Sequence, residues 1–112
     1  MTLNKEKQFV MKELFGCHEH SFTKKVWINN NPEYKEHFFL PKWNPQEKRE
    51  FWDRIWEAMD KKQKTDYILI LRDITGSNDE HILLDIFWIV HTAKPEICWK
   101  ALIKLLKMKD KG

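Results

Sequence analysis

The sequence contains few of the residues that would point to a specific chemistry. Its 112 residues include only three glycines, and none of them lies in a phosphate-binding motif. The chain has no nucleophile-elbow motif, and its five scattered histidines do not define a catalytic pair. We therefore name no catalytic residue. A non-catalytic role is favoured, and the question of an activity stays open.

Long apolar runs and a cysteine framework are also missing. The most apolar stretches are interrupted by Arg72, Asp73 and Asp85, so none approaches the roughly 20 apolar residues of a membrane span. The first sixteen residues are polar and charged, without the apolar core of a signal peptide. Two cysteines without such a signal are typical of a reducing compartment. We expect a cytoplasmic protein that makes no membrane contact.

Aromatic residues are abundant by contrast. The chain is 13% aromatic and 42% hydrophobic, which is enough apolar material for a packed core. Its length fits a single domain over residues 1–112. The 20 basic and 17 acidic residues are interspersed, so the net charge of +3 indicates a mixed, solvated surface more than a nucleic-acid stripe.

Outside residues 67–91, the spacing and type of apolar residues predict three helices and two short strands. The first helix covers residues 2–15 and ends at Gly16, which suits the left-handed position after a helix. The clearest helix begins at Pro45, with Asn44 as its N-cap, and runs to about Lys61. The remaining expected elements are strands over 23–29 and 37–40, a polar connection over 17–20, and a helix over 93–107 capped by Thr92.

Residues 67–74 and 81–91 are predicted to form a β-hairpin. Apolar side chains occupy successive positions along both segments, and 75–79 has the composition of a turn. Both faces of this hairpin are apolar, whereas a strand with one solvated face would alternate with polar residues. We therefore expect an α+β fold with helices on both sides of a mostly antiparallel sheet, a three-layer sandwich. In that fold Ile70, Ile86 and Phe87 are almost fully buried.

Three blocks along the chain carry a family resemblance. They are Lys12–Gly16, Phe51–Met59 and Thr92–Leu102, and the predicted hairpin lies between the last two. In this order they resemble the phage ABA-sandwich domain family, a group of small phage and prophage proteins. Cys17 stands where a tryptophan is common in that family, and residues 29–42 form a longer segment than usual. The resemblance implies a three-layer sandwich and a phage or prophage origin, but no activity and no functional residues.

One short segment carries side chains that can bind metals. Cys17, His18 and His20 lie close together, and Cys98 could supply a fourth ligand. Structural zinc sites, however, use two ligand pairs at separate places in the chain, and the second pair is missing here. We therefore interpret the segment as an ordinary loop and expect neither a metal nor another cofactor.

Two further groups of charged residues have alternative interpretations. Asp85 lies among apolar residues and could pair with Arg72 across the hairpin, or it could be a perturbed carboxylate in a cleft. Lysines cluster on the last helix and at the end of the central helix, where they form either a solvated face or a nucleic-acid surface. These lysines are Lys100, Lys104 and Lys107, and Lys61, Lys62 and Lys64.

The last helix also carries apolar residues beyond its expected core face. Trp99, Ile103 and Leu106 lie there, and Trp43 is a further aromatic candidate for a binding surface. Either the helix is buried around most of its circumference or an apolar strip is left exposed, and an exposed strip with a tryptophan is typical of a protein interface. We therefore expect a small phage accessory protein that binds a protein partner, either a host factor (such as a defence component) or a second copy. The alternative is a nucleic-acid-binding protein or a small enzyme that uses His18, His20 or the lysines.

Overall fold

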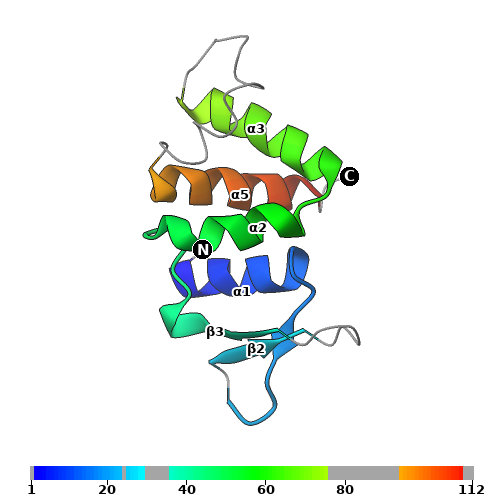
Figure 1. Ribbon diagram of the computed structural model, residues 1–112, viewed down its shortest axis with the longest axis vertical. Coiled ribbons are helices and arrows are strands. Elements are labelled where there is room, and N and C mark those ends of the chain that lie inside the picture. The colour runs from blue at the N-terminus through cyan, green and yellow to red at the C-terminus, as the bar shows by residue number, and fades with distance from the viewer. Residues whose placement is uncertain (1, 24, 30–35, 76–93, 110–112) are drawn as a thin grey trace. The chain divides into compact units, whose positions relative to one another are not determined.

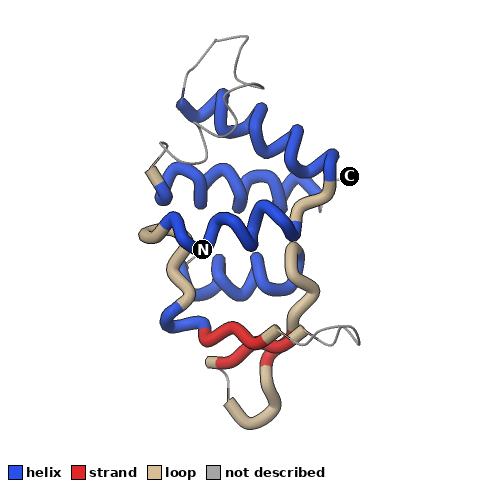
Figure 2. The backbone as a smooth tube through the Cα atoms, viewed as in Figure 1, coloured by secondary structure: helices blue, strands red, loops and turns tan. Residues whose placement is uncertain are grey.

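The computed structural model describes residues 2–23, 25–29, 36–75 and 94–109. The chain divides into two compact units, Met1–Asn44 and Pro45–Gly112, which are described separately below. The first contains a helix and a three-stranded antiparallel sheet, and the described part of the second contains helices (Figures 1 and 2). The predicted mixture of helix and sheet is therefore confirmed.

The first helix, α1, covers Leu3–Glu13. The Thr2 hydroxyl caps it by accepting a hydrogen bond from the Lys5 amide at 3.3 Å. Gly16 has a φ of +63°, a conformation that suits glycine because it lacks a Cβ atom. The chain turns there, and the Cys17 amide donates to the Met11 carbonyl at 2.9 Å. This helix and its glycine stop are as predicted.

The sheet follows directly. It consists of β1 (His18–Glu19), β2 (Val26–Ile28) and β3 (His37–Phe39), paired antiparallel in that order. Trp27 of β2 lies between Glu19 and Phe38 in the register. The strands expected over 23–29 and 37–40 are confirmed, but the expected polar connection over 17–20 is wrong. That segment pairs with β2 and forms an edge strand.

A short 3₁₀ helix, η1 (Leu40–Lys42), completes the first unit. The side chain of Lys7 is buried, and its ammonium donates to the Leu40 carbonyl at 3.1 Å and to Asn44 Oδ1 at 2.7 Å. Charged hydrogen bonds of this kind offset the cost of burying the ammonium. Lys7 therefore ties α1 to the backbone that follows the sheet.

The helix expected to run from Pro45 to about Lys61 is not continuous. The structure has a 3₁₀ turn, η2 (Arg49–Phe51), followed by α2 (Trp52–Ala58). Asn44 does not cap it, because its side chain accepts from Lys7 and donates to the Pro41 carbonyl. Met59 is extended, with φ −79° and ψ 138°, and ends α2. The prediction is therefore wrong about the start and the length of this helix.

The largest correction concerns residues 67–74, which are helical. They belong to α3 (Lys61–Thr75), so the first strand of the predicted hairpin is wrong. Asp60 and Gln63 form a reciprocal capping box: Asp60 Oδ1 accepts from the Gln63 amide at 2.7 Å, and Gln63 Oε1 accepts from the Asp60 amide at 2.9 Å. Ile70 is buried as predicted, but on a helix face. The second predicted strand, with Asp85, Ile86 and Phe87, lies outside the described residues, and the three-layer sandwich is not confirmed.

The last described helix is α5 (Pro95–Lys109), and it packs against α3. Figure 1 shows the two helices running in opposite directions. Rings of α2 and α3 also meet, since Trp52 and Trp56 lie 6.1 and 6.2 Å from Tyr67 between ring centroids. The helix predicted over 93–107 is confirmed from Pro95 onward, and its proposed cap, Thr92, falls outside the described residues.

Candidate functional site

The residues predicted to form a partner surface are buried. The exposed fractions are 4% for Trp99, 5% for Ile103 and 0% for Leu106. The expected exposed strip is therefore wrong, because α5 is covered around most of its circumference. Seven of its side chains are buried: Cys98, Trp99, Ala101, Leu102, Ile103, Leu105 and Leu106.

Trp43 is buried as well, with 4% of its surface exposed. Its ring lies 5.9 Å from Phe15 and 6.1 Å from Phe38, measured between ring centroids. Phe15 and Phe38 are 5.0 Å apart, so the three rings form one cluster under the sheet. Edge-to-face and tilted contacts of this kind stabilise a core. Trp43 has a packing role here, and the expectation that it is available to a partner is wrong.

Three lysines of α5 are exposed: Lys100, Lys104 and Lys107. They follow each other at helical spacing and form a charged stripe on a helix whose apolar side chains from Cys98 to Leu106 are buried. In α3, Lys61 and Lys62 are exposed, and Lys64 lies 5.3 Å from the Trp56 ring centroid. A helix that is apolar on its other sides needs such a stripe for contact with water, so the pattern fits a solvated face.

The metal-capable side chains of the first unit are divided between the two faces of the sheet. Successive residues of a strand point to opposite faces, so Cys17 and Glu19 lie on one side and His18 and His20 on the other. His20 Nδ1 accepts a hydrogen bond from the Phe22 amide at 3.2 Å, which leaves the proton of a neutral ring on Nε2. No group of three metal-binding side chains forms among the residues that the structure describes.

Cys98 lies in the second unit, where it is buried beside Tyr67. Burial raises the pKa of the Cys98 thiol, although the hydrogen bond with Tyr67 and the charge of Arg49 lower it in part. Burial also raises the pKa of Tyr67 well above its usual value, and Cys98 adds to that shift. Both groups are therefore neutral at pH 7. A neutral, enclosed thiol is a poor nucleophile, so this pair is part of the core.

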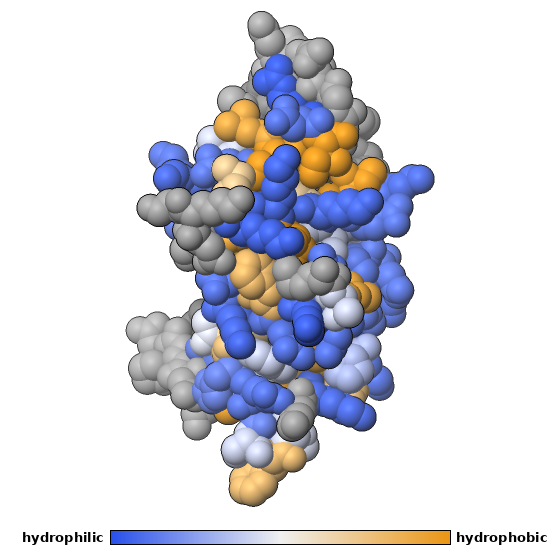
Figure 3. Space-filling view, turned by 180° about the vertical axis from the view of Figure 1, so that it is seen from behind, coloured by the Kyte–Doolittle hydropathy of each residue, from blue (hydrophilic) through white to orange (hydrophobic). Residues whose placement is uncertain are grey.

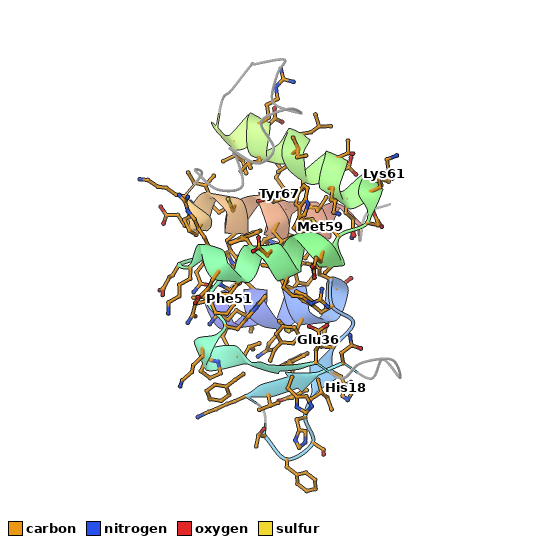
Figure 4. The ribbon with its side chains drawn as sticks, in the orientation of Figure 1. His18, Glu36, Phe51, Met59, Lys61 and Tyr67 are labelled. Atoms are coloured by element: carbon orange, nitrogen blue, oxygen red, sulfur yellow. The ribbon has the colours of Figure 1, made fainter. Side chains whose placement is uncertain are left out.

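The sheet has one face packed on α1 and one open face. Trp27 and Phe38 occupy the packed face, where Lys12 lies 5.8 Å from the Trp27 ring centroid. The alternate residues form the other side, which we call the open face, and no member of it is buried. Figure 4 shows His18 on the side of the strands away from α1. The open face consists of His18, His20, Val26, Ile28, His37 and Phe39.

Strand β3 also leaves backbone groups unpaired. The Asn29 amide donates to the Glu36 carbonyl at 3.1 Å, and the Leu40 amide donates to the Lys25 carbonyl at 2.8 Å. In an antiparallel ladder with these bonds, the amides and carbonyls of the alternate residues, His37 and Phe39, point away from β2. The Phe39 carbonyl accepts from the Trp43 amide at 3.1 Å. Within the described residues, both amides and the His37 carbonyl have no hydrogen-bond partner.

Phe39 brings these two features together. It is 44% exposed, it belongs to the open face, and it lies in an edge strand of the sheet that the described residues form. Other apolar side chains of the chain are also exposed, and Figure 3 shows apolar surface over α3, which carries Leu69 and Ile74. Those two residues closely precede residues 76–93, which lie outside the described chain, so their exposure carries no argument about a binding surface.

Sequence reasoning missed the open face, although a signal for it was present. The short strands over 23–29 and 37–40 were predicted, and alternation within them places Val26 with Ile28 and His37 with Phe39. Two facts were missing. The segment 17–20 had to be recognised as a strand, and the register between strands had to be known. Register depends on which face is buried, and that follows from the packing of Trp27 and Phe38 on α1.

A comparison with models of known protein families, with curated proteins and with solved structures finds no significant match. The resemblance to phage ABA-sandwich domains therefore stays a prediction. In the described part of the chain, no helix is long and apolar enough to cross a membrane.

Proposed function

We propose that the chain acts by binding another protein, without catalysis, through the open face and the edge of β3. The observation that carries this proposal is Phe39, an aromatic side chain that is 44% exposed beside unpaired backbone amides. Exposed aromatic rings contribute strongly to protein interfaces, and an open strand edge can accept a further strand. This surface replaces the buried residues of α5 as the candidate site.

The chemistry of the open face supports binding more than catalysis. Its six side chains are three histidines and three apolar residues, and none is an acid or an alcohol. The His20 ring is engaged with the Phe22 amide, so it is positioned by its own loop. The exposed lysines of α5 fit a solvated face equally well, and we propose no nucleic-acid function from them.

The phage or prophage origin remains part of the proposal through the family resemblance alone. The resemblance would place the chain in the cytoplasm of a bacterial host, where its partner would be a host factor or a second copy. A bacterial lysate is therefore the appropriate sample for a first test.

The test compares proteins retained by the immobilised wild-type chain and by two variants. Phe39→Asp places a charge on the open face, and we expect it to reduce recovery of a specific partner at least about tenfold. Leu3→Asp is the matched control, because Leu3 is 41% exposed in the same unit but lies in the first turn of α1. An acidic side chain is favourable at that end of a helix.

Far-UV circular dichroism establishes that both variants are folded. Retention of the same proteins in equal amounts by the wild type and by Phe39→Asp would contradict binding of a host factor through this surface, and together with a monomeric wild type it would contradict the proposal. Loss of a partner with both variants would place the binding surface elsewhere on the first unit.

A further inference from the structure

We infer that the partner of the β3 edge is a second copy of this chain, whose β3 pairs antiparallel with the first β3 across a two-fold axis. The inference rests on the proposed function, because it names the occupant of the same surface. It extends the three-stranded sheet to six strands, with the two β3 strands in the middle.

The backbone groups of the edge complement one another under a two-fold rotation. If His37 of one copy lies opposite Phe39 of the other, each His37 amide faces a Phe39 carbonyl and each Phe39 amide faces a His37 carbonyl. The Phe39 carbonyl already accepts from the Trp43 amide, but a carbonyl oxygen has a second lone pair. A register that places His37 opposite His37 would not bring the two described pairs of amides and carbonyls together, because Phe39 would then lie opposite residue 35, outside the described residues.

Charge distinguishes the edge of β3 from the edge of β1. The run from His37 to Pro41 contains no acidic residue, lysine or arginine, so pairing with itself places no like charges opposite each other. On β1, the alternate residue that points outward is Glu19, and a two-fold pairing there would bring two carboxylates together. Natural edge strands are commonly protected by charges, and β3 lacks that protection.

The side chains of the edge also fit a symmetric pair. Directly opposite residues of an antiparallel pair lie on the same face of a sheet, so Phe39 would lie beside the His37 ring of the second copy. The exposed surface of Phe39 would then be covered on one side. Because β3 has only three residues, the interface is small, and we expect a reversible dimer that dissociates on dilution.

Sedimentation equilibrium of the full chain over a wide concentration range tests the inference, with two substitutions at one position. Phe39→Ala removes the phenyl ring and keeps the backbone N–H, whereas Phe39→Pro removes the phenyl ring and the backbone N–H. Phe39 has φ −86° and ψ 99°, and its amide makes no bond to β2, so proline is tolerated by the fold. We expect Phe39→Pro to dimerise at least about tenfold more weakly than Phe39→Ala, because each dimer loses two hydrogen bonds.

Disulfide trapping provides a second test that needs no proline. Directly opposite residues have Cα atoms about 5.5 Å apart, within the range of a disulfide, whereas diagonal residues are farther apart. Chains with His37→Cys and with Phe39→Cys, carrying tags of different size, are mixed and oxidised with oxidised glutathione. We expect the mixed disulfide to exceed each self-disulfide several-fold.

The outcomes separate this inference from the proposed function. A wild type that stays monomeric, equal dimerisation of Phe39→Ala and Phe39→Pro, or a predominance of self-disulfides would overturn the two-fold pairing. If Phe39→Asp still loses a partner from the lysate in those cases, the proposed function stands with a different occupant. If Phe39→Asp retains the same lysate proteins as the wild type, and the wild type is monomeric, then the two-fold pairing and the proposed function are both wrong.

Discussion

The two units of the chain bury different kinds of groups. In the first, a charged Lys7 ammonium is held by the Leu40 carbonyl and Asn44, and three aromatic rings pack under a small sheet. In the second, helices bury aliphatic and aromatic side chains, together with a neutral tyrosine and thiol. Both units therefore have an apolar core, and the first adds specific polar contacts that hold a buried ammonium and fix its loops. Substitutions of each kind test this difference.

The largest effect is expected from Trp99→Ala in the second unit. Removing a buried tryptophan costs the transfer free energy and leaves a cavity, so we expect a loss of about 3–5 kcal/mol in the free energy of unfolding. Lys100→Ala changes the exposed neighbouring residue of the same helix and should stay within about 0.5 kcal/mol of the wild type. Chemical denaturation measures both.

Trp99→Ala also decides between core and interface. Full stability combined with weaker association would restore the interface interpretation of α5, which its burial contradicts.

A smaller loss is expected from Lys7→Met in the first unit. Methionine retains the apolar stem but removes the ammonium, so the Leu40 carbonyl and Asn44 each lose a hydrogen bond within the fold. Leaving a buried acceptor without a hydrogen-bond donor lowers the free energy of unfolding by about 1–3 kcal/mol. Lys5→Met, at an exposed position of the same helix, is the control and should have little effect. Equal stability of the two variants would show that the polar contacts of the first unit contribute little.

These residues also show how far the sequence could predict the structure. Gly16, the helical spacing of apolar residues over 2–15 and the strand-forming residues of 23–29 and 37–40 are local signals, and they gave α1 and two strands correctly. The error at 67–74 arose because an apolar run of that length fits a buried strand as well as a helix. Asp60 and Gln63 carried a helix-start signal just before the run, but it was not recognised.

The candidate site could not have been predicted in the same way. The apolar residues of α5 extend beyond one face, which is compatible with an exposed strip or with a helix that is covered on most sides. Only the packing of neighbouring elements distinguishes the two. The open face likewise depends on pairing between strands that are distant in sequence, so spacing along one segment does not reveal it.

Tyr67→Phe should have a still smaller effect, and one that depends on pH. The variant loses a long hydrogen bond of 3.5 Å to the Cys98 carbonyl, so we expect a loss of about 1 kcal/mol or less at pH 7. Tyr67 and Cys98 both have a pKa that is raised in the folded state. As the pH rises, the unfolded chain therefore loses these two protons before the folded chain does, and this favours unfolding.

Stability should therefore fall above about pH 8.5, the ordinary pKa of a thiol, and more steeply near pH 10, where an unfolded tyrosine ionises. Urea denaturation between pH 7 and pH 10.5 measures the decline, and Tyr67→Phe should reduce its steep part. A stability that rises with pH over this range would contradict the burial of both groups.

The smallest effect is expected at Leu69, which is exposed on α3. In a helix, alanine is more favourable than valine by about 0.5 kcal/mol, whereas in a strand the preference is reversed. We therefore expect Leu69→Ala to be more stable than Leu69→Val in thermal denaturation. The opposite order would favour the strand that the sequence alone predicted for residues 67–74.

The loop between β1 and β2 is a place where the chain of the first unit can be cut or extended. Phe22 is 89% exposed there, and its neighbours Ser21 and Thr23 are exposed too. Exposed loop tips are preferred sites of proteolytic cleavage and tolerate insertions. A protease that cuts after aromatic residues would open the chain between two paired strands and leave α1 and β3 on separate fragments. The same loop therefore offers a place to insert an affinity tag or a fluorophore, and rejoining of the two fragments would report on assembly of the sheet.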